Sequence, residues 1–286
     1  MIIIEISGGL GNQMFQYALG QRFVSMGKEV KYDLSFYNEN VQTLRKFELD
    51  IFHVDCPVAT EYELRKMGKV QNFFDRISRK FYSGCNKIYK ENLDAGYQPE
   101  IFELDDTYLS GYWQSEKYFK DIRDRILAIY RMPEGMNRNS KELLSKMQNE
   151  NSVSIHIRRG DYLSKENYRV YGGICTTHYY KKAFEYVREN LANPRFYIFT
   201  NDIEWVKQQF KGDDMWIVEC NNNVDNYFDM FLMSNCKSNI VANSTFSWWG
   251  AWLNQNTEKI VISPDKWFRN HSVSSAICDD WIRISE

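Results

Sequence analysis

The second half of the chain alternates regularly between short apolar runs and segments with helical spacing of apolar residues. The expected strands are 152–157, 195–200, 215–219, 239–242 and 259–263, and the expected helices between them are 177–191, 203–210, 224–236 and 245–254. This alternation predicts a parallel, doubly wound α/β sheet. In such a sheet ligands bind outside the carboxyl ends of the strands, so the residues that follow each strand are the candidate site residues.

The amino-terminal end carries the start of a second unit of this kind. Residues 1–6 form an apolar run that predicts a buried strand, and a glycine-rich segment, a helical pattern and a second strand at 29–33 follow. Strand, turn, helix and strand make a βαβ unit, in which the helix N-terminus favours an anion. Gly9 and Gly11 have the spacing of a dinucleotide fingerprint, but position 14 is Met, so the turn could also be purely structural.

Between these two patterns the chain is less regular. Residues 45–150 have a mostly helical pattern, with one expected strand at 108–113, after which Ser115 is expected to cap a helix. The segment 133–140 is the best candidate linker. We therefore expect two Rossmann-like domains, residues 1–145 with helical insertions and residues 146–286.

Composition limits the classes of function. The 286 residues are 43% hydrophobic, enough for two modest cores, and the formal charge of −2 argues against nucleic acid as the main partner. The six cysteines lack the spacing of a zinc site or a disulfide framework. No signal peptide and no apolar run of about 18 residues is seen, so we expect no membrane span.

Two adjacent arginines follow the expected strand at 152–157. Arginine stays charged and offers a rigid fork of donors, so Arg158 and Arg159 at a strand end predict a phosphorylated ligand. Alternation along the strand places Ser154, His156 and Arg158 on one face, toward a cleft. The alternative is a surface ion-pair cluster in which Asp161 and neighbouring acids neutralise both arginines.

Two further strand ends carry polar residues. Asp202 could accept hydrogen bonds from a sugar or a base, or could cap the helix that follows. Residues 243–247 place an amide and three hydroxyl groups at the start of a helix, which suits a phosphate, whereas the tryptophans at 248–252 suit a core.

Five segments together resemble the bacterial α-1,2-fucosyltransferases of glycosyltransferase family 11. They are 8–18, 111–116, 156–162, 199–202 and 243–253, in order over nearly the whole chain. The resemblance implies a GT-B-like fold, with two Rossmann-like domains facing a central cleft. It implies transfer of L-fucose from GDP-β-L-fucose to the 2-hydroxyl of a galactosyl residue, with inversion and without a metal or other cofactor. The first domain would then form the acceptor side, and the second would hold GDP-fucose.

The resemblance also implies roles for single residues. Arg158 would neutralise the β-phosphate, Asn12 would reach the diphosphate and fucose, and Asp161 would hold the arginines. Donor contacts are expected from Gly11, His156, Arg159, Asp202, Asp229, Asn243, Ser244, Thr245, Phe246 and Ser247. Acceptor-side candidates are Gln13, Asp33, Trp113 and Glu116.

Two of these roles have open alternatives. Asp229 would grip guanine, but it could instead be an exposed helix position. The general base is open between Asp161, Asp33, Glu116 and a departing phosphate oxygen.

The expected partners are GDP-fucose and a galactose-terminated oligosaccharide. The expected location is the cytoplasm, either free or at the surface of the inner membrane, with no membrane span. Three alternatives remain: a transferase for another GDP-sugar, a protein O-fucosyltransferase, and a non-catalytic protein that binds GDP or a glycan.

Overall fold

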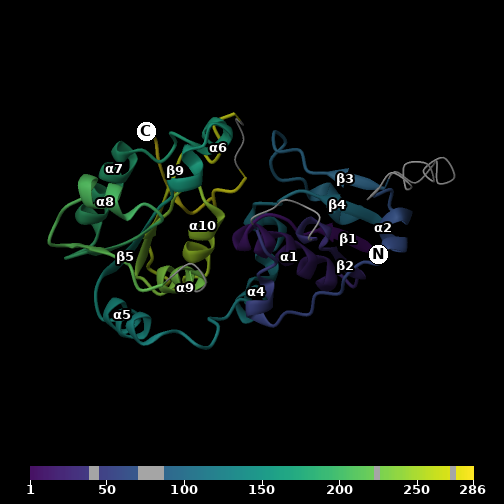
Figure 1. The fold of residues 1–286 in the computed structure, drawn as a ribbon, viewed down its shortest axis with the longest axis horizontal. Helices are drawn as coiled ribbons and strands as arrows, with labels where there is room; N and C mark the ends of the chain where they lie inside the picture. Colours follow the sequence, from purple (N-terminus) through teal and green to yellow (C-terminus); the bar gives the residue numbers. More distant parts are fainter. Residues whose placement is uncertain (39–44, 70–86, 222–225, 271–274) are drawn as a thin grey trace. The chain divides into compact units, whose positions relative to one another are not determined.

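The computed structural model divides the chain into two compact units, Met1–Arg131 and Met132–Glu286 (Figure 1). The described residues are 1–38, 45–69, 87–221, 226–270 and 275–286, without the side chains of Asp161, Leu163 and Glu166. Each unit is an α/β structure around a parallel sheet, so the predicted α/β class with two Rossmann-like units is confirmed. The predicted central cleft concerns the placement of one unit relative to the other and stays a prediction.

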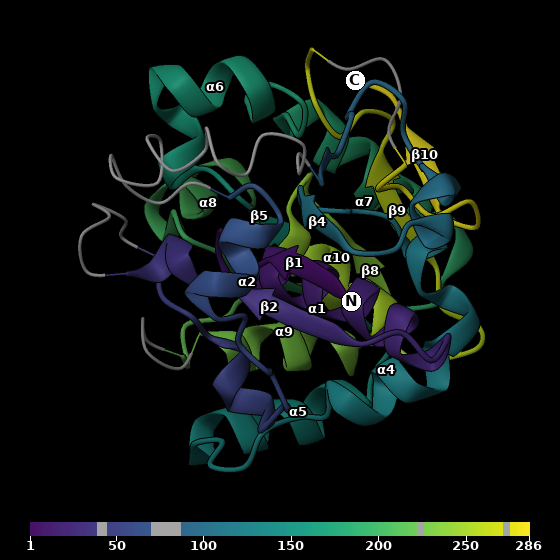
Figure 2. The ribbon, with the colours of Figure 1, turned by 90° about the vertical axis from the view of Figure 1, so that its right-hand side faces the viewer.

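The first unit contains a four-stranded parallel sheet in the order β2-β1-β4-β3, and Figure 2 shows β1 between β2 and β4. Its strands are β1 (Ile2–Glu5), β2 (Val30–Asp33), β3 (Ile88–Lys90) and β4 (Thr107–Ser110). Its helices are α1 (Leu10–Ser25), α2 (Glu61–Lys66) and α4 (Arg123–Ile129), with 3-10 turns η1 (Ser35–Tyr37), η2 (Leu49–Phe52), η3 (Pro99–Glu103), η4 (Glu116–Tyr118) and η5 (Lys120–Ile122).

Helices cover both faces of this sheet. Tyr32 on β2 is paired with Ile4 on β1, and its ring stacks on Tyr17 of α1 with centroids 5.2 Å apart. Ile3 and Tyr108, which are paired across β1 and β4, pack against α2. Because successive residues of a strand face opposite sides, α1 and α2 lie on opposite faces.

The second unit contains a six-stranded parallel sheet in the order β10-β9-β8-β5-β6-β7. Its strands are β5 (Ser152–Ile157), β6 (Arg195–Thr200), β7 (Met215–Ile217), β8 (Ser238–Ile240), β9 (Val261–Pro264) and β10 (Ile282–Ile284). Its helices are α5 (Arg138–Gln148), α6 (Lys165–Tyr171), α7 (Thr177–Asn190), α8 (Ile203–Gln209), α9 (Tyr227–Ser234) and α10 (Thr245–Trp252), with the 3-10 turn η6 (Gly160–Leu163).

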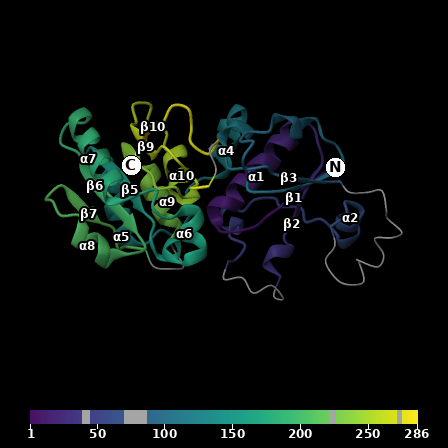
Figure 3. The same cartoon turned by 90° about the horizontal axis from the view of Figure 1, so that it is seen from above.

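The two faces of β5 pack against different helices. Val153, Ile155 and Ile157 belong to the core under α7 and α8. On the other face Ser154 accepts a hydrogen bond from Asn239, whose side chain also donates to Met233 O on α9. Figures 1 and 3 show α7 and α8 on one side of the sheet and α9 and α10 on the other. The predicted alternation is confirmed, but Ser154 is buried under α9 and does not line a cleft.

Three expectations change in the structure. The contact-based boundary follows Arg131, not residue 145, because α5 belongs to the second unit: Asn137 donates to Cys220 O at 3.1 Å and Ser140 to Asn221 Oδ1 at 2.7 Å. The described parts of 45–131 contain short helical turns, not long helices. The expected strand at 108–113 ends at Ser110, and Ser115 caps η4, as predicted, by accepting from Lys117 N.

Among the described helices, none has the length and apolar character that crossing a bilayer requires.

Candidate functional site

At the carboxyl end of β5, His156 and Arg158 mark one candidate region. The His156 ring is 5.7 Å from the ring of Phe246 on α10, and its buried Nδ1 has no hydrogen-bond partner in the described structure. Burial, together with the Arg158 charge, lowers the pKa of His156 to about 3. The imidazole is therefore neutral near pH 7. Arg158 is half-buried, with its guanidinium 5.9 Å from the centre of the Tyr162 ring.

Arg159 points elsewhere. Its Nε donates to Asp202 Oδ2 at 3.1 Å, and its guanidinium lies 3.9 Å from the centre of the Trp205 ring. Its backbone N–H donates to Asn201 Oδ1 at 3.0 Å. These contacts tie the loop after β5 to the loop after β6. Arg159 is thus engaged by its neighbours, and the two arginines have different environments.

Asp202 fulfils the capping alternative and has a second partner. Its Oδ1 accepts from Trp205 N at 3.2 Å, which caps α8, while its Oδ2 holds Arg159. The expected partner of the arginines was Asp161, whose side chain lies outside the described residues. In the described structure the acid paired with Arg159 comes from the next strand.

Two side chains of the segment between β8 and α10 are used in hydrogen bonds within the protein. The Asn243 amide donates to Tyr171 O at 3.0 Å and Trp267 O at 3.2 Å, and Ser247 Oγ accepts from Ala242 N at 3.2 Å. Both side chains are buried, which corrects their expected role as donor contacts: they shape the turn.

The three residues before Ser247 are more exposed than Asn243 and Ser247. Ser244 holds the N-cap position and is 7% exposed, and Thr245 and Phe246 are half-buried. The first backbone bond of α10 runs from Trp248 N to Ser244 O, so the amides of 245–247 precede the helical hydrogen bonds. Such amides suit an anion.

Asp229 lies in the first turn of α9 and is half-buried, so the alternative of an exposed helix position is wrong. Burial raises its pKa to about 6, although the hydrogen bond from Asn221 Nδ2 at 2.6 Å lowers it in part. Asn221 in turn accepts from Asn137 and Ser140 of the α5 start. A carboxylate held in this way suits a ligand that offers N–H donors.

The second candidate region is the glycine turn of the first unit. Gly8 has φ +78°, and a Cβ there would lie 2.6 Å from Asn12 Nδ2. Glycine is therefore required both for the backbone conformation and for the position of Asn12. Asn12 Oδ1 accepts from Gln114 Nε2 at 3.0 Å. Gly11 is buried beside it in the first turn of α1.

Gln13 is an internal brace of this turn. Its amide donates to Gly8 O at 3.1 Å and Lys46 O at 2.8 Å, and its Oε1 accepts from Glu48 N at 2.8 Å. The side chain is fully buried, which corrects the expectation that it contacts an acceptor.

Asp33 is likewise internal. It is 2% exposed and accepts from Tyr108 OH at 2.8 Å and from Ser35 N at 2.9 Å. Lys69 Nζ lies 3.7 Å away and donates to Glu5 Oε1 at 2.8 Å. These bonds remove Asp33 from the candidates for acceptor contact and for general base. Sequence reasoning missed Glu5 and Lys69, although a lone acid in an apolar strand was a signal for Glu5.

The turn after β4 is held by an acid that the sequence did not single out. Glu91 Oε2 accepts from Tyr112 N at 2.7 Å and Trp113 N at 3.0 Å, and burial raises the Glu91 pKa. Trp113 has φ +56° and its ring is fully buried in an edge contact with Tyr118. Trp113 is thus a core residue, which corrects its expected acceptor role. Glu116, in η4, is half-buried and stays an acceptor-side prediction.

Comparisons with known proteins give a consistent relationship. The family model "Glycosyl transferase family 11" matches residues 1–285. An alpha-1,2-colitosyltransferase of Escherichia coli is 34% identical over 301 residues, which cover 100% of this chain and 99% of that protein. Galactoside alpha-(1,2)-fucosyltransferase 1 of Leontopithecus chrysomelas is 26% identical over 166 residues, 54% of this chain and 45% of that protein. A crystal structure of POFUT1 in complex with GDP has a TM-score of 0.42 at 11% identity, covering 92% of this chain and 97% of that one.

Proposed function

Because this chain belongs to glycosyl transferase family 11, we propose that it transfers L-fucose from GDP-β-L-fucose to the 2-hydroxyl of a galactosyl residue, with inversion and without a metal ion. The α-1,2 linkage in the names of both relatives supports the acceptor position. The name of the Escherichia coli relative, which matches over its whole length, gives a second candidate donor sugar. That sugar is colitose, which is fucose without its 3-hydroxyl group.

The position of Arg158 beside the start of α10 supports this proposal best. Arg158 lies against Tyr162, whose hydroxyl donates to Asn243 O at 3.0 Å, directly before the first turn of the helix. The Arg158 charge and the segment that leads into α10 are therefore both next to Tyr162. When the sugar–phosphate bond breaks, negative charge grows on the diphosphate, and donors already in place stabilise it.

The neighbouring groups have complementary roles in the proposal. His156 is neutral, so in this proposal it would form hydrogen bonds with the donor and fill space near Phe246. Arg158 would supply the positive charge. Asp229 would accept from the N–H groups of guanine while Asn221 holds it in place. Arg159 would position the strand-end loops through Asp202.

Deprotonation of the acceptor hydroxyl needs a base. The burial and hydrogen bonds of Asp33 withdraw it from this role. Three candidates remain to accept the proton of the acceptor hydroxyl: Asp161, Glu116 and the departing β-phosphate oxygen.

The test is incubation of the purified chain with GDP-fucose and lactose in EDTA, followed by mass spectrometry and linkage determination. We expect one deoxyhexose on O2 of galactose. GDP-colitose offered in equal amount would decide between the two donor sugars. Loss of transfer in EDTA that a divalent cation restores would contradict metal independence.

A variant pair tests the role of Arg158. Arg158→Ala should lower the transfer rate by about 10²–10³, the usual effect of removing a preorganised donor. Arg195→Ala is the matched control, because Arg195 is the first residue of β6, at the end opposite to the carboxyl edge, and its guanidinium donates to Asp213 O at 2.8 Å. A folded Arg158→Ala variant with the native rate would refute the assignment.

A further inference from the structure

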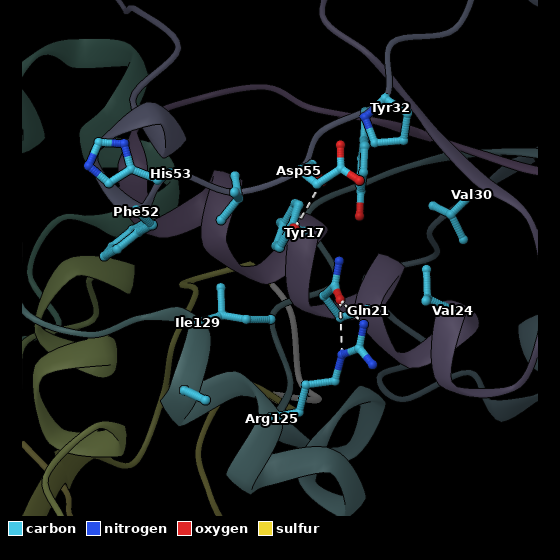
Figure 4. A pocket seen from close by; sticks show the side chains of 13 residues that line it. Tyr17, Gln21, Val24, Val30, Tyr32, Phe52, His53, Asp55, Arg125 and Ile129 are labelled. Atoms are coloured by element: carbon cyan, nitrogen blue, oxygen red, sulfur yellow. Dashed lines mark hydrogen bonds between the residues drawn. The ribbon is translucent and has the colours of Figure 1, made fainter.

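The first unit has a groove on the flank of α1, with a cavity volume of about 550 Å³. Its walls come from the later turns of α1, from β2, from the segment 52–57 and from α4 (Figure 4). None of the residues assigned above to the glycine turn lines it. The volume is within the range of sites that hold small ligands.

The floor of the groove is aromatic and polar at the same time. Tyr17, Gln21 and Tyr32 are each at least nine-tenths buried. The hydroxyl of Tyr17 donates to Asp55 O at 3.0 Å, whereas the hydroxyl of Tyr32 has no partner of good geometry among the described residues. Figure 4 shows the Tyr32 side chain directed toward Gln21. Burial raises the pKa of Tyr32, with a small opposite effect of the Gln21 amide, so the hydroxyl stays protonated.

The rim is charged but nearly balanced. Arg125 is exposed, and its Nε and Nη2 donate to Gln21 Oε1 at 3.0 and 2.7 Å. These two bonds fix the guanidinium and leave Nη1 for a ligand. Asp55 and His53 are exposed on the same rim. A fixed cation facing a carboxylate favours a neutral ligand that both donates and accepts, such as a polyol, over a phosphate.

Apolar groups complete the walls. Val24 and Val30 lie at one end in Figure 4, and Phe52 lies at the other. A pyranose ring has hydroxyl groups around its edge and C–H groups on its faces. Planar polar side chains combined with aromatic and apolar walls match both kinds of group.

We propose that this groove binds a sugar unit of the acceptor glycan beyond the galactosyl residue that reacts, an inference that rests on the proposed function. Gln21 follows Asn12 by nine residues, so the floor lies about 14 Å along α1 from the glycine turn. That span exceeds one sugar ring. A longer acceptor would therefore contact both places, and a disaccharide only the turn.

The kinetic test compares lactose with lacto-N-neotetraose as acceptors. The native chain should prefer the tetrasaccharide, and Arg125→Ala should lower that preference in kcat/KM by about tenfold, mainly through KM, because a hydrogen bond to a charged donor is lost. Arg22→Ala is the control: Arg22 lies on the same helix and pairs with Asp121, outside the groove. Equal preferences in the native chain and both variants would overturn the inference.

A binding test locates the sugar without requiring turnover. The chain is labelled at its tyrosines, and the Tyr32 signal is identified by its loss in Tyr32→Phe. With GDP present, lacto-N-neotetraose should shift that signal, and an unmoved signal at saturating tetrasaccharide would overturn the inference. A shift of the Tyr32 signal without transfer to lactose or to the tetrasaccharide would support sugar binding in the groove and contradict the proposed activity. Transfer without a shift would support the proposed activity and contradict sugar binding in the groove.

Discussion

Two buried tyrosines of the first unit should respond in opposite ways to loss of their hydroxyl groups. Tyr32 and Tyr130 are 1% and 2% exposed. The hydroxyl of Tyr130 donates to Met14 O at 2.7 Å, whereas that of Tyr32 is buried without a hydrogen bond of good geometry among the described residues. We therefore expect Tyr130→Phe to destabilise the unit and Tyr32→Phe to stabilise it.

The magnitudes follow from the hydrogen bonds. Loss of the Tyr130 bond should lower the free energy of unfolding by about 1 kcal/mol, the usual net value of one bond. An unsatisfied buried hydroxyl costs about 1–3 kcal/mol, so its removal at Tyr32 should raise the free energy of unfolding by about 1 kcal/mol after a small packing loss. The two variants should therefore differ by about 2 kcal/mol.

Hydrogen exchange of the α1 backbone amides is the best measurement, because it reports the first unit separately from the second. Urea unfolding followed by circular dichroism gives an independent value. If Tyr32→Phe destabilised the unit as much as Tyr130→Phe, the hydroxyl would have a partner, with the Gln21 amide the nearest one, and the reasoning would be wrong. If Tyr32→Phe both lost sugar binding and gained stability, the Tyr32 hydroxyl would serve ligand binding at a cost in stability.

Three further changes have distinct expected outcomes. Binding of GDP should strengthen between about pH 5 and pH 7, because the Asp229 pKa of about 6 means that its carboxylate forms in this range; calorimetry with Asp229→Asn should give a flat profile. Asp202→Ala should lower the free energy of unfolding by about 1–2 kcal/mol through loss of a cap and an ion pair, and Asp202→Asn by under about 1 kcal/mol because asparagine also caps; tryptophan fluorescence in urea separates them. Gly8→Ala should reduce transfer far more than Gly27→Ala: both have φ near +80°, but only the first would push Asn12 away, and equal rates in the two variants would contradict this.

The central strands of the sheets could be predicted from the sequence because their signals are strong. The expected strand at 152–157 has the bounds of β5, since Val153, Ile155 and Ile157 alternate with polar residues at the period of a strand. β3 and β10 were missed. Each has only three residues, one of them charged, and lies at the edge of its sheet, where it pairs with a single neighbour. Such a short edge strand leaves no recognisable apolar pattern in the sequence.

The site was predictable in location but not in detail. Residues after the strands do gather at the carboxyl edges, as parallel topology requires. Whether an amide there faces a ligand or the backbone depends on loops distant in sequence, and Gln13 and Asn243 both serve the backbone. The pairing of Arg159 with Asp202 joins residues 43 positions apart, and no local pattern indicates it.

The turn held by Glu91 has a consequence for laboratory evolution of acceptor range. A non-glycine residue at φ +56° stores strain of about 1–2 kcal/mol, which the two hydrogen bonds to Glu91 offset. The same turn carries Gln114 to Asn12, so a substitution that relaxes it also releases the asparagine. Libraries should therefore hold Glu91 and Trp113 constant and diversify the exposed rim at His53, Asp55 and Arg125, where new side chains meet solvent and the glycine turn at the start of α1 is left intact.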